Sequence, residues 1–398
     1  MDMLALTNCR ILTMTDCDFE KGYILINGDK IVEVGDMKDF NSIKEKYDHA
    51  TIAVLDLPGK YVLPGFVDAH CHVGLWEDSV GFEGEDGNEA TDPVTPHLRA
   101  IDGIYHMDRA FEEAIQSGVT TAVCGPGSAN VIGGQFAAIK TYGKTIDEMV
   151  IKQPVAVKVA FGENPKSVYA EKKQMPSTRM ATAALLRESL YKAKEYMESM
   201  EEYKRNPEEF EKPEFDMKME ALIPVLQKKI PLKAHAHRAD DILTALRIAK
   251  EFNVNITIEH GTEGYLIADI LKNENIGVVA GPLLTDRSKV ELRNQTMKNP
   301  AILSNAGVKV AIMTDHPCVP LNLLLLCAAM AAKEGMNEHE ALKAITINAA
   351  ELCGIAERVG SIEEGKDADL VVFEGHPFDL RSRVLYTFIN GNIVYSFR

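Results

Sequence analysis

Two histidine pairs of the form His-x-His have the spacing of metal ligands. The first is His70 and His72, in PGFVDAHCHVG, and the second is His235 and His237, in KAHAHRADD. Side chains two positions apart on a strand point to the same face, so each pair can present two imidazoles to one divalent ion. Surface histidines on an edge strand are the alternative, but the first run is otherwise apolar. The spacing predicts metal binding and, with it, activation of a water molecule.

Two further polar side chains follow apolar runs at distances that match strand–helix units. His260 lies in IEHG, 25 residues after His235, and Asp315 lies in MTDHP, 55 residues after His260. Taken singly, each is as readily a capping or core polar residue. In a parallel α/β barrel, however, the carboxyl ends of all strands open on one face, where active sites lie. We therefore expect both pairs, His260 and Asp315 to meet on one rim.

The elements that would position these residues alternate between strands and helices. Helical patterns at 107–117, 239–251 and 265–273 separate several apolar runs, as in a (β/α)8 TIM barrel of the α/β class. Only seven strands are evident, so the eighth lies in the glycine-rich stretch after Cys124, or the barrel is distorted by a long excursion between 162 and 230. The predicted strands are 61–72, 119–124, 155–161, 232–237, 255–260, 276–280 and 308–314.

Both ends of the chain carry short β patterns that neither end could bury alone. Turns at Asn27-Gly28 and Asn390-Gly391 predict a hairpin in each. The most economical arrangement is one small β-sandwich built from both termini. We therefore divide the chain into an N-terminal half of this β-sandwich (1–59), a distorted barrel (60–358) and a C-terminal half (359–398). Within the barrel, the charged stretch 189–214 predicts a solvated helix followed by a loop.

Composition limits the partners that the protein can have. The 398 residues are 46% apolar and 26% charged, as in a folded protein, and the formal net charge is −16. Such a surplus of acid disfavours nucleic acid and anionic membranes, and no apolar run approaches the roughly 18–20 residues of a membrane span. Seven cysteines without CxxC spacing predict reduced thiols, and the first residues lack a signal-peptide pattern. We expect a cytoplasmic protein with a small-molecule substrate; assembly into a homo-oligomer is left open.

Together the motifs resemble those of the amidohydrolase superfamily, and within it the imidazolonepropionase-related group. The resemblance covers nearly the whole chain, through PGFVDAHCHVG, HAHRADD, IEHG, MTDHP and the tail GSIEEGKDADLVVFEGHP. It implies a hydrolase in which one or two divalent ions at the barrel rim provide a metal-bound hydroxide that attacks a C–N bond. Zinc is the first expectation, while iron, manganese, cobalt and nickel stay open. By position, the implied metal ligands are His70, His72, His235, His260 and Asp315.

The resemblance also assigns catalytic roles. Asp315 would take a proton from water and deliver it to the leaving nitrogen, a role worth about 10²- to 10⁴-fold in rate. His260 or His237 would bind the developing oxyanion. The loop after Cys124 could turn backbone N–H groups toward a substrate carboxylate, although it is as readily a tight structural loop. The candidate substrate contacts are His237, Arg238, Ser128 and Asn130.

The bridging position between two ions is where the chain departs from many binuclear relatives. Some relatives carry a carbamylated lysine at this position and others a glutamate. Here the strand reads VAVKVAFGENP, with Lys158 inside it and Glu163 at its end, where rim ligands belong. We favour Glu163 over a Lys158 carbamate. If neither residue binds, the site holds one ion, as the likeness to imidazolonepropionases suggests.

The expected activity is hydrolysis of an amide or cyclic amide bond in a small polar substrate. The nearest alternatives are a deaminase acting on an amidine-like carbon and a dipeptidase of the same superfamily. A different class would be a non-catalytic assembly protein that keeps the barrel without its metals. Such a protein should lack one or more rim ligands, whereas this chain retains all five of the implied ones.

Overall fold

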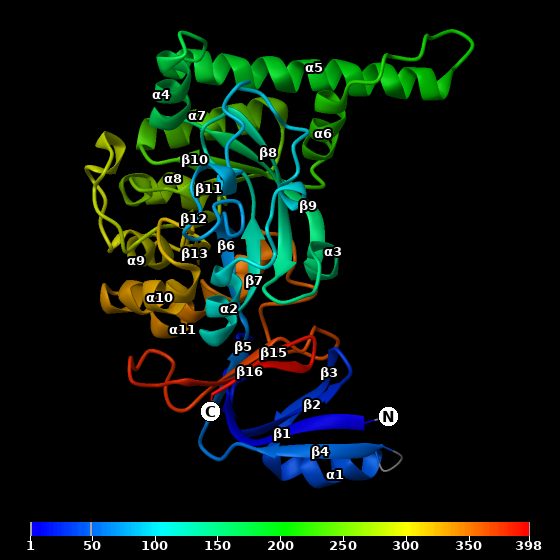
Figure 1. Ribbon diagram of the computed structural model, residues 1–398, viewed down its shortest axis with the longest axis vertical. Coiled ribbons are helices and arrows are strands. Elements are labelled where there is room, and N and C mark those ends of the chain that lie inside the picture. The colour runs from blue at the N-terminus through cyan, green and yellow to red at the C-terminus, as the bar shows by residue number, and fades with distance from the viewer. Residues whose placement is uncertain (1, 48–49, 398) are drawn as a thin grey trace.

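The computed structural model describes residues 2–47 and 50–397 and consists of a barrel and a terminal sheet (Figure 1). The barrel fills the upper part of Figure 1, and strands from both ends of the chain form the lower part, where both termini lie. In the described residues each part is built on an eight-stranded sheet. The prediction of a distorted α/β barrel with a separate β region from both termini is confirmed.

The barrel strands lie side by side in the order in which they occur in the chain. Between the last strand and the first, Asp315 N–H donates to the carbonyl of His70 (3.2 Å) and His72 N–H donates to that of His316 (2.9 Å). The barrel is therefore nearly closed at the rim that carries the predicted ligands. Its strands are β6 (Phe66–Cys71), β7 (Val119–Cys124), β8 (Ile132–Lys140), β9 (Val150–Ala160), β10 (Leu232–Ala236), β11 (Ile256–His260), β12 (Val278–Ala280) and β13 (Val310–Ile312).

The eighth strand lies in the stretch after Cys124, one of the two explanations that the sequence left open. This strand, β8, pairs antiparallel with both β7 and β9, whereas the other barrel ladders are parallel. Only residues 125–131 and 141–149 connect it to its neighbours. Parallel crossovers need about a dozen residues or more, so such short links return the chain antiparallel. A hairpin thus replaces one unit of the expected strand–helix alternation.

Helices cover the outside of the barrel, as the alternation predicts. α2 (Arg109–Gln116) and α7 (Ala239–Phe252) match their predicted ranges, and the third range begins with a 3-10 turn before α8 (Ala268–Asn273). The remaining α-helices of the barrel are α3 (Ile146–Met149), α4 (Glu163–Glu171), α5 (Arg179–Arg205), α6 (Met217–Leu226), α9 (Asn299–Asn305), α10 (Leu324–Lys333), α11 (Glu338–Lys343) and α12 (Ile347–Leu352).

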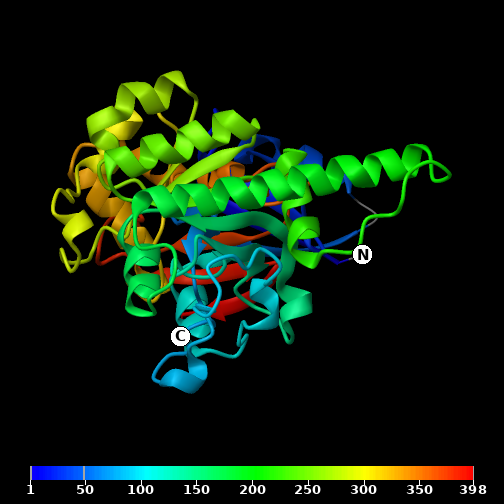
Figure 2. The same cartoon turned by 90° about the horizontal axis from the view of Figure 1, so that it is seen from above.

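The excursion between 162 and 230 contains α4, α5 and α6. α5 extends sideways beyond the rest of the barrel, with its far end joined to α6 by a loop (Figure 2). Its surface carries i,i+4 pairs such as Lys192–Glu188 (2.6 Å) and Lys194–Glu198 (3.9 Å). These exposed pairs fit the solvated helix predicted for 189–214.

The terminal sheet joins segments from opposite ends of the chain in the order β16-β15-β14-β5-β1-β2-β3, with β4 paired to β1. The prediction of one strand at 61–72 is wrong, because β5 belongs to this sheet and β6 to the barrel. Gly65 lies between the two strands. A residue with a side chain does not fit there, because its Cβ would lie only 2.1 Å from Thr120 Oγ1. The elements are β1 (Asp2–Ile11), β2 (Phe19–Asn27), β3 (Lys30–Asp36), α1 (Phe40–Lys46), β4 (Thr51–Asp56), β5 (Tyr61–Pro64), β14 (Leu370–Phe373), β15 (Val384–Ile389) and β16 (Asn392–Ser396).

A buried ionic cluster connects the barrel to the terminal sheet. Lys140, at the end of β8, is 2% exposed and pairs with Asp367 (2.8 Å) and with Asp369, just before β14. Asp367 also pairs with Lys30 (2.5 Å) and Arg358 (2.7 Å). Charges taken out of water in this way need every partner in place, so the cluster fixes the two parts relative to each other.

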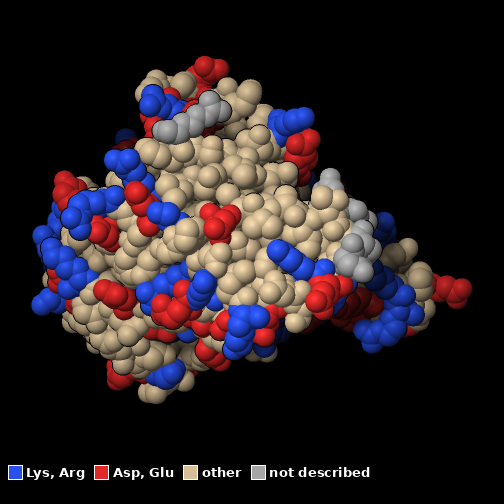
Figure 3. All heavy atoms as spheres, turned by 90° about the horizontal axis from the view of Figure 1, so that it is seen from below, with Lys and Arg blue, Asp and Glu red and all other residues tan. Residues whose placement is uncertain are grey.

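On the face seen from below, positive and negative side chains are interspersed around a mostly uncharged centre (Figure 3). Among the described helices, none has the length and apolarity that crossing a bilayer requires. All seven cysteines are free, as the sequence predicts.

Replacing the buried lysine tests this connection. Lys140→Met leaves Asp369 without its cation and should lower the free energy of unfolding by about 3 kcal/mol, since removing one partner of a buried pair typically costs 3–5 kcal/mol and Lys30 and Arg358 still compensate Asp367. Urea unfolding followed by circular dichroism measures the change. Lys144→Met, at an exposed position nearby, is the matched control and should stay within about 0.5 kcal/mol of the wild type. Equal stability of the two variants would contradict the role of the cluster.

Candidate active site

The structure brings the predicted ligands together in two buried groups at the carboxyl ends of the barrel strands. One group is His70, His72 and Asp315, and the other is His235, His237 and His260. Within each group the potential ligand atoms all lie within 4.8 Å of one another. The expectation that residues far apart in sequence converge on one rim agrees with this geometry.

The first group joins the two ends of the barrel sheet. His70 and His72 lie at the end of β6, and Asp315 follows β13. The Asp315 carboxylate lies 3.2 Å from His72 Nε2 and 3.7 Å from His70 Nε2. Two imidazoles and a carboxylate within this distance suit a divalent ion of the zinc, iron or manganese kind.

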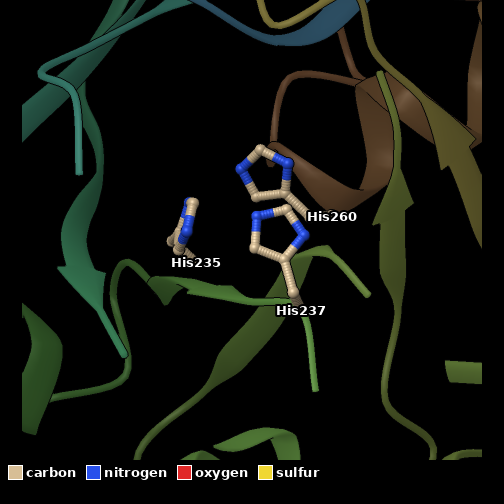
Figure 4. A group of neighbouring side chains, drawn as sticks. All are labelled: His235, His237 and His260. Carbon is tan, nitrogen blue, oxygen red and sulfur yellow. The ribbon is translucent and has the colours of Figure 1, made fainter. Parts of the chain in front are cut away.

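The second group consists of three imidazoles. His235 lies near the end of β10, and His237 follows that strand directly. His260 is the last residue of β11. Figure 4 shows the three rings gathered around one space, with a ring nitrogen of each turned toward it. The sequence predicted His235 and His260 as ligands and His237 as a substrate contact, whereas the structure places all three together.

Two of these residues have a left-handed backbone conformation, which directs their side chains. His260 has φ 71° and Asp315 has φ 54°, and each lies where a strand turns into its following loop. This region costs a residue with a side chain about 1–3 kcal/mol, a cost often found at functional sites. The turn at each position directs the side chain across the barrel mouth.

Each imidazole is oriented through its Nδ1 atom by a fixed partner. His72 and His260 donate to the backbone carbonyls of Gly125 (2.7 Å) and Gly281 (2.9 Å). The Nδ1 atoms of the other three histidines lie against Glu259 (His70, 2.7 Å), Ser128 (His235, 2.8 Å) and Thr262 (His237, 2.7 Å). Metal-bound histidines usually use their second nitrogen in this way, which fixes the ring and leaves Nε2 for the ion. The donor set therefore fits one or two divalent ions.

The electrostatic setting keeps these groups in the protonation states that metal binding requires. Burial lowers the pKa of His260 to about 4, and burial together with neighbouring cations holds the pKa values of His70, His235 and His237 well below the usual range. These imidazoles are therefore neutral at pH 7. Burial opposes ionisation of Asp315, but His260 and the contact with His72 keep the pKa of its carboxyl below the ordinary value.

A buried carboxylate inside the barrel supports the first group. Glu259, fully buried on β11, accepts hydrogen bonds from His70 Nδ1 (2.7 Å) and Thr257 Oγ1 (2.6 Å) and pairs with Lys233 (3.0 Å). A charge at this depth is tolerated only because every contact is made. The sequence analysis missed this role, although Thr257 and Glu259 alternate as polar residues on an otherwise apolar strand.

The two candidates for a bridging ligand are placed differently from the sequence expectation. Lys158, fully buried on β9, lies beside the first group, with Nζ 3.0 Å from His70 Nε2. Glu163 begins α4, after the turn at Gly162, and is absent from both metal-ligand groups. Its carboxylate instead accepts from Glu291 N–H (3.4 Å). The turn at Gly162 places Glu163 outside both groups, although it follows the strand end directly.

A cavity of about 390 Å³ opens in front of both groups. His72, Asp315 and the three histidines of the second group line it. Lys289 is the one lysine or arginine among the described residues that line it, and its Nζ donates to Asn164 Oδ1 (2.8 Å). The sequence pattern did not indicate Lys289, because a lone lysine in a loop carries no signal. Other lining residues include Trp76, Ser128, Asn164, Leu283 and Cys318.

The predicted substrate contacts separate into two kinds. Ser128 lines the cavity and holds His235. Asn130 instead donates to Thr95 (2.8 Å), in the loop after β6, and accepts from Tyr169 (2.5 Å) on α4, and it is absent from the lining. Arg238 is paired with Asp240 (2.9 Å) and lines a separate hollow outside this cavity. Of these three residues, Ser128 alone lines the cavity.

The barrel carries two buried ligand groups that fit divalent ions, and the cavity opens in front of both. Residues 61–394 match the amidohydrolase family, and the chain belongs to that family of metal-dependent hydrolases acting on carbon–nitrogen bonds. The imidazolonepropionase of Fusobacterium nucleatum is 25% identical over 89% of this chain and 85% of its own length. The predicted resemblance to the imidazolonepropionase-related amidohydrolases is confirmed.

Two other proteins show the extent of the likeness. The crystal structure of an amidohydrolase from Thermotoga maritima MSB8 matches with a TM-score of 0.92 and 47% identity, covering 99% of this chain and 100% of that one. The amidohydrolase tasK of Hapsidospora irregularis is 28% identical over 85% of this chain. This chain spans only 37% of the length of tasK, which is therefore a much longer protein.

The buried carboxylate provides a test of ligand orientation. Glu259→Gln removes the charge that orients His70 and should weaken metal binding about 10- to 100-fold, the usual cost of losing such a partner. Titration of metal-free protein with Co²⁺, followed by visible absorption, measures the affinity. Glu338→Gln, at an exposed position on α11, should bind as the wild type does. Unchanged affinity in Glu259→Gln would show that His70 needs no such support.

Proposed function

We propose that this protein hydrolyses the C–N bond of an amide or cyclic amide in a small polar substrate, with Asp315 moving the proton. The observation that carries this proposal is the position of Asp315, which contacts His72 and lines the same cavity as the second histidine group. A divalent ion held there supplies Lewis-acid polarisation and lowers the pKa of bound water to about 7. Zinc is the preferred ion, with iron, manganese, cobalt and nickel as alternatives.

Asp315 suits the role of proton carrier. Its carboxylate is ionised at neutral pH, so it can accept a proton from the attacking water. An amide nitrogen leaves poorly until it is protonated, and the same carboxyl group can then deliver that proton to it. His260 and His237 border the cavity, and we propose that an ion held by their Nε2 atoms would stabilise the oxyanion that develops on the substrate.

The cavity supports a small substrate with an anionic group. Its volume of about 390 Å³ lies at the lower end of the range for small-molecule pockets, about 300–1,000 Å³. Lys289 adds a positive charge, and its Nζ donates to the neutral amide of Asn164. N-acyl amino acids, dipeptides and ring amides that carry a carboxylate combine these features. We propose a cytoplasmic location as well, on the free cysteines.

Two alternatives use the same residues differently. A deaminase would release ammonia from an amidine-like carbon, and a dipeptidase would cleave a peptide bond, so product analysis separates them from a lactam or N-acyl hydrolase. A non-catalytic assembly protein would have no need of two buried, fully oriented ligand groups. The complete donor set disfavours that reading.

Metal removal tests the catalytic proposal. Incubation with dipicolinic acid and gel filtration should abolish turnover of whichever N-acyl amino acid, dipeptide or lactam a screen identifies, and Zn²⁺ or another divalent ion should restore it. Release of amine or ammonia measures turnover, and protein carried through the same steps without chelator is the control. Turnover that survives complete removal would refute the mechanism, and fully loaded protein inactive on every class would favour an assembly role.

The bridging ligand can be assigned by counting ions. We propose that Lys158, as the amine or its carbamate, rather than Glu163, completes the first group, because Nζ lies 3.0 Å from His70 Nε2. Burial lowers the pKa of Lys158 to about 8, which favours the neutral amine that carbamate formation needs. Lys158→Met should lose about one equivalent of metal by elemental analysis, whereas Glu163→Gln should keep the wild-type content. The opposite pattern would restore Glu163 as the bridge.

A further inference from the structure

A second carboxylate, Glu291, points at the histidine group formed by His235, His237 and His260. It lies on a 3-10 turn, Val290–Leu292, in the loop between β12 and α9. Its side chain is 1% exposed, and Oε2 accepts from Glu163 N–H (2.9 Å). Its other oxygen, Oε1, has no hydrogen-bond partner among the described residues. The nearest imidazole atoms to Oε1 are His237 Nε2 at 3.6 Å and His235 Nε2 at 3.9 Å.

An unpartnered oxygen of a buried carboxylate is costly, so a group outside the protein atoms must compensate it. The two imidazole contacts are too long to be hydrogen bonds. Lys289, the nearby cation, directs its Nζ to Asn164 Oδ1 instead. The Nδ1 atoms of His235 and His237 face Ser128 and Thr262, so their Nε2 atoms are the ones turned toward Glu291.

The spacing fits ligands that share one ion. Nitrogen and oxygen ligands lie about 2.0–2.2 Å from zinc, so two tetrahedral ligands lie about 3.4 Å apart. The measured 3.6 and 3.9 Å are close to this separation, and a cation among these atoms would satisfy Oε1 and both nitrogens at once.

We propose that Glu291 is a ligand of the ion held by His235, His237 and His260. This inference rests on the proposed metal dependence and adds to it a ligand from outside the barrel strands. The second group then offers four protein donors, three imidazoles and one carboxylate, which is a set that suits zinc.

The same geometry gives Glu163 a positioning role. Glu291 Oε2 accepts from Glu163 N–H (2.9 Å), and Glu163 Oε2 accepts from Glu291 N–H (3.4 Å). This reciprocal pair fixes the turn on which Glu291 lies. The neighbouring residues Ser288, Lys289 and Leu292 line the cavity, so binding of the ion would also hold one cavity wall in place.

Metal titration tests the assignment without any substrate. Metal-free wild-type and Glu291→Gln protein are titrated with Co²⁺ by calorimetry and visible absorption. Loss of a direct ligand should lower the affinity for one equivalent of Co²⁺ at least about 100-fold. Loss of a residue that only hydrogen-bonds to a ligand already lowers metal affinity about 10- to 100-fold. The absorption bands of the weakened equivalent should shift as well. Glu163→Gln is the matched control, because the amide oxygen still accepts from Glu291 N–H, and it should bind within twofold of the wild type.

Two further variants keep the outcome decisive. His235→Asn should weaken binding of the same Co²⁺ ion as Glu291→Gln does, and His72→Asn should weaken binding of the other Co²⁺ ion. Retention of the second equivalent in Glu291→Gln shows that the variant is folded. Wild-type affinity and an unchanged spectrum in Glu291→Gln would overturn the inference while leaving the proposed function standing. Failure of the wild-type protein to bind any Co²⁺ would instead overturn the proposed function, and this inference with it.

Discussion

A charge buried at the centre of the barrel is the constraint on which the site depends. Glu259 is fully buried, so His70, Lys233 and Thr257 must all stay in contact with it. Thr257 lies on β11 itself, whereas His70 and Lys233 come from β6 and β10 and fix these two strands relative to β11. The hydrogen bond to His70 also leaves its Nε2 turned toward Asp315 (3.7 Å). The orientation of this ligand therefore depends on one polar cluster.

The antiparallel strand β8 and the loop before it contribute contacts around this cluster. Its hairpin places the loop 125–131 at the rim, where Gly125 and Ser128 hold His72 and His235. It also carries Phe136, whose ring lies beneath the ammonium groups of Lys158 (5.6 Å) and Lys233 (5.7 Å). A regular strand–helix unit would supply neither contact. The departure from a standard barrel is thus part of the site.

The sequence predicted most of the site because its ligands share a rule. Each histidine pair, His260 and Asp315 follow an apolar strand, and strand ends of a parallel barrel meet on one face. The same rule does not place Glu163 in either group, because the turn at Gly162 intervenes, whereas Lys158 lies inside its strand and contacts His70. Glu291 and Lys289 could not be found, since they lie in a long loop whose path depends on tertiary contacts. Gly65 likewise divides a continuous apolar run between two sheets, which periodicity does not reveal.

Trp76 gives the molecule an internal optical reporter. It is the sole tryptophan of the chain, it lines the cavity, and its ring lies 5.0 Å from that of His72. All indole emission therefore originates within a few ångströms of the first ligand group. When the indole is excited selectively, so that the 12 tyrosines do not contribute, changes in fluorescence refer to this one place.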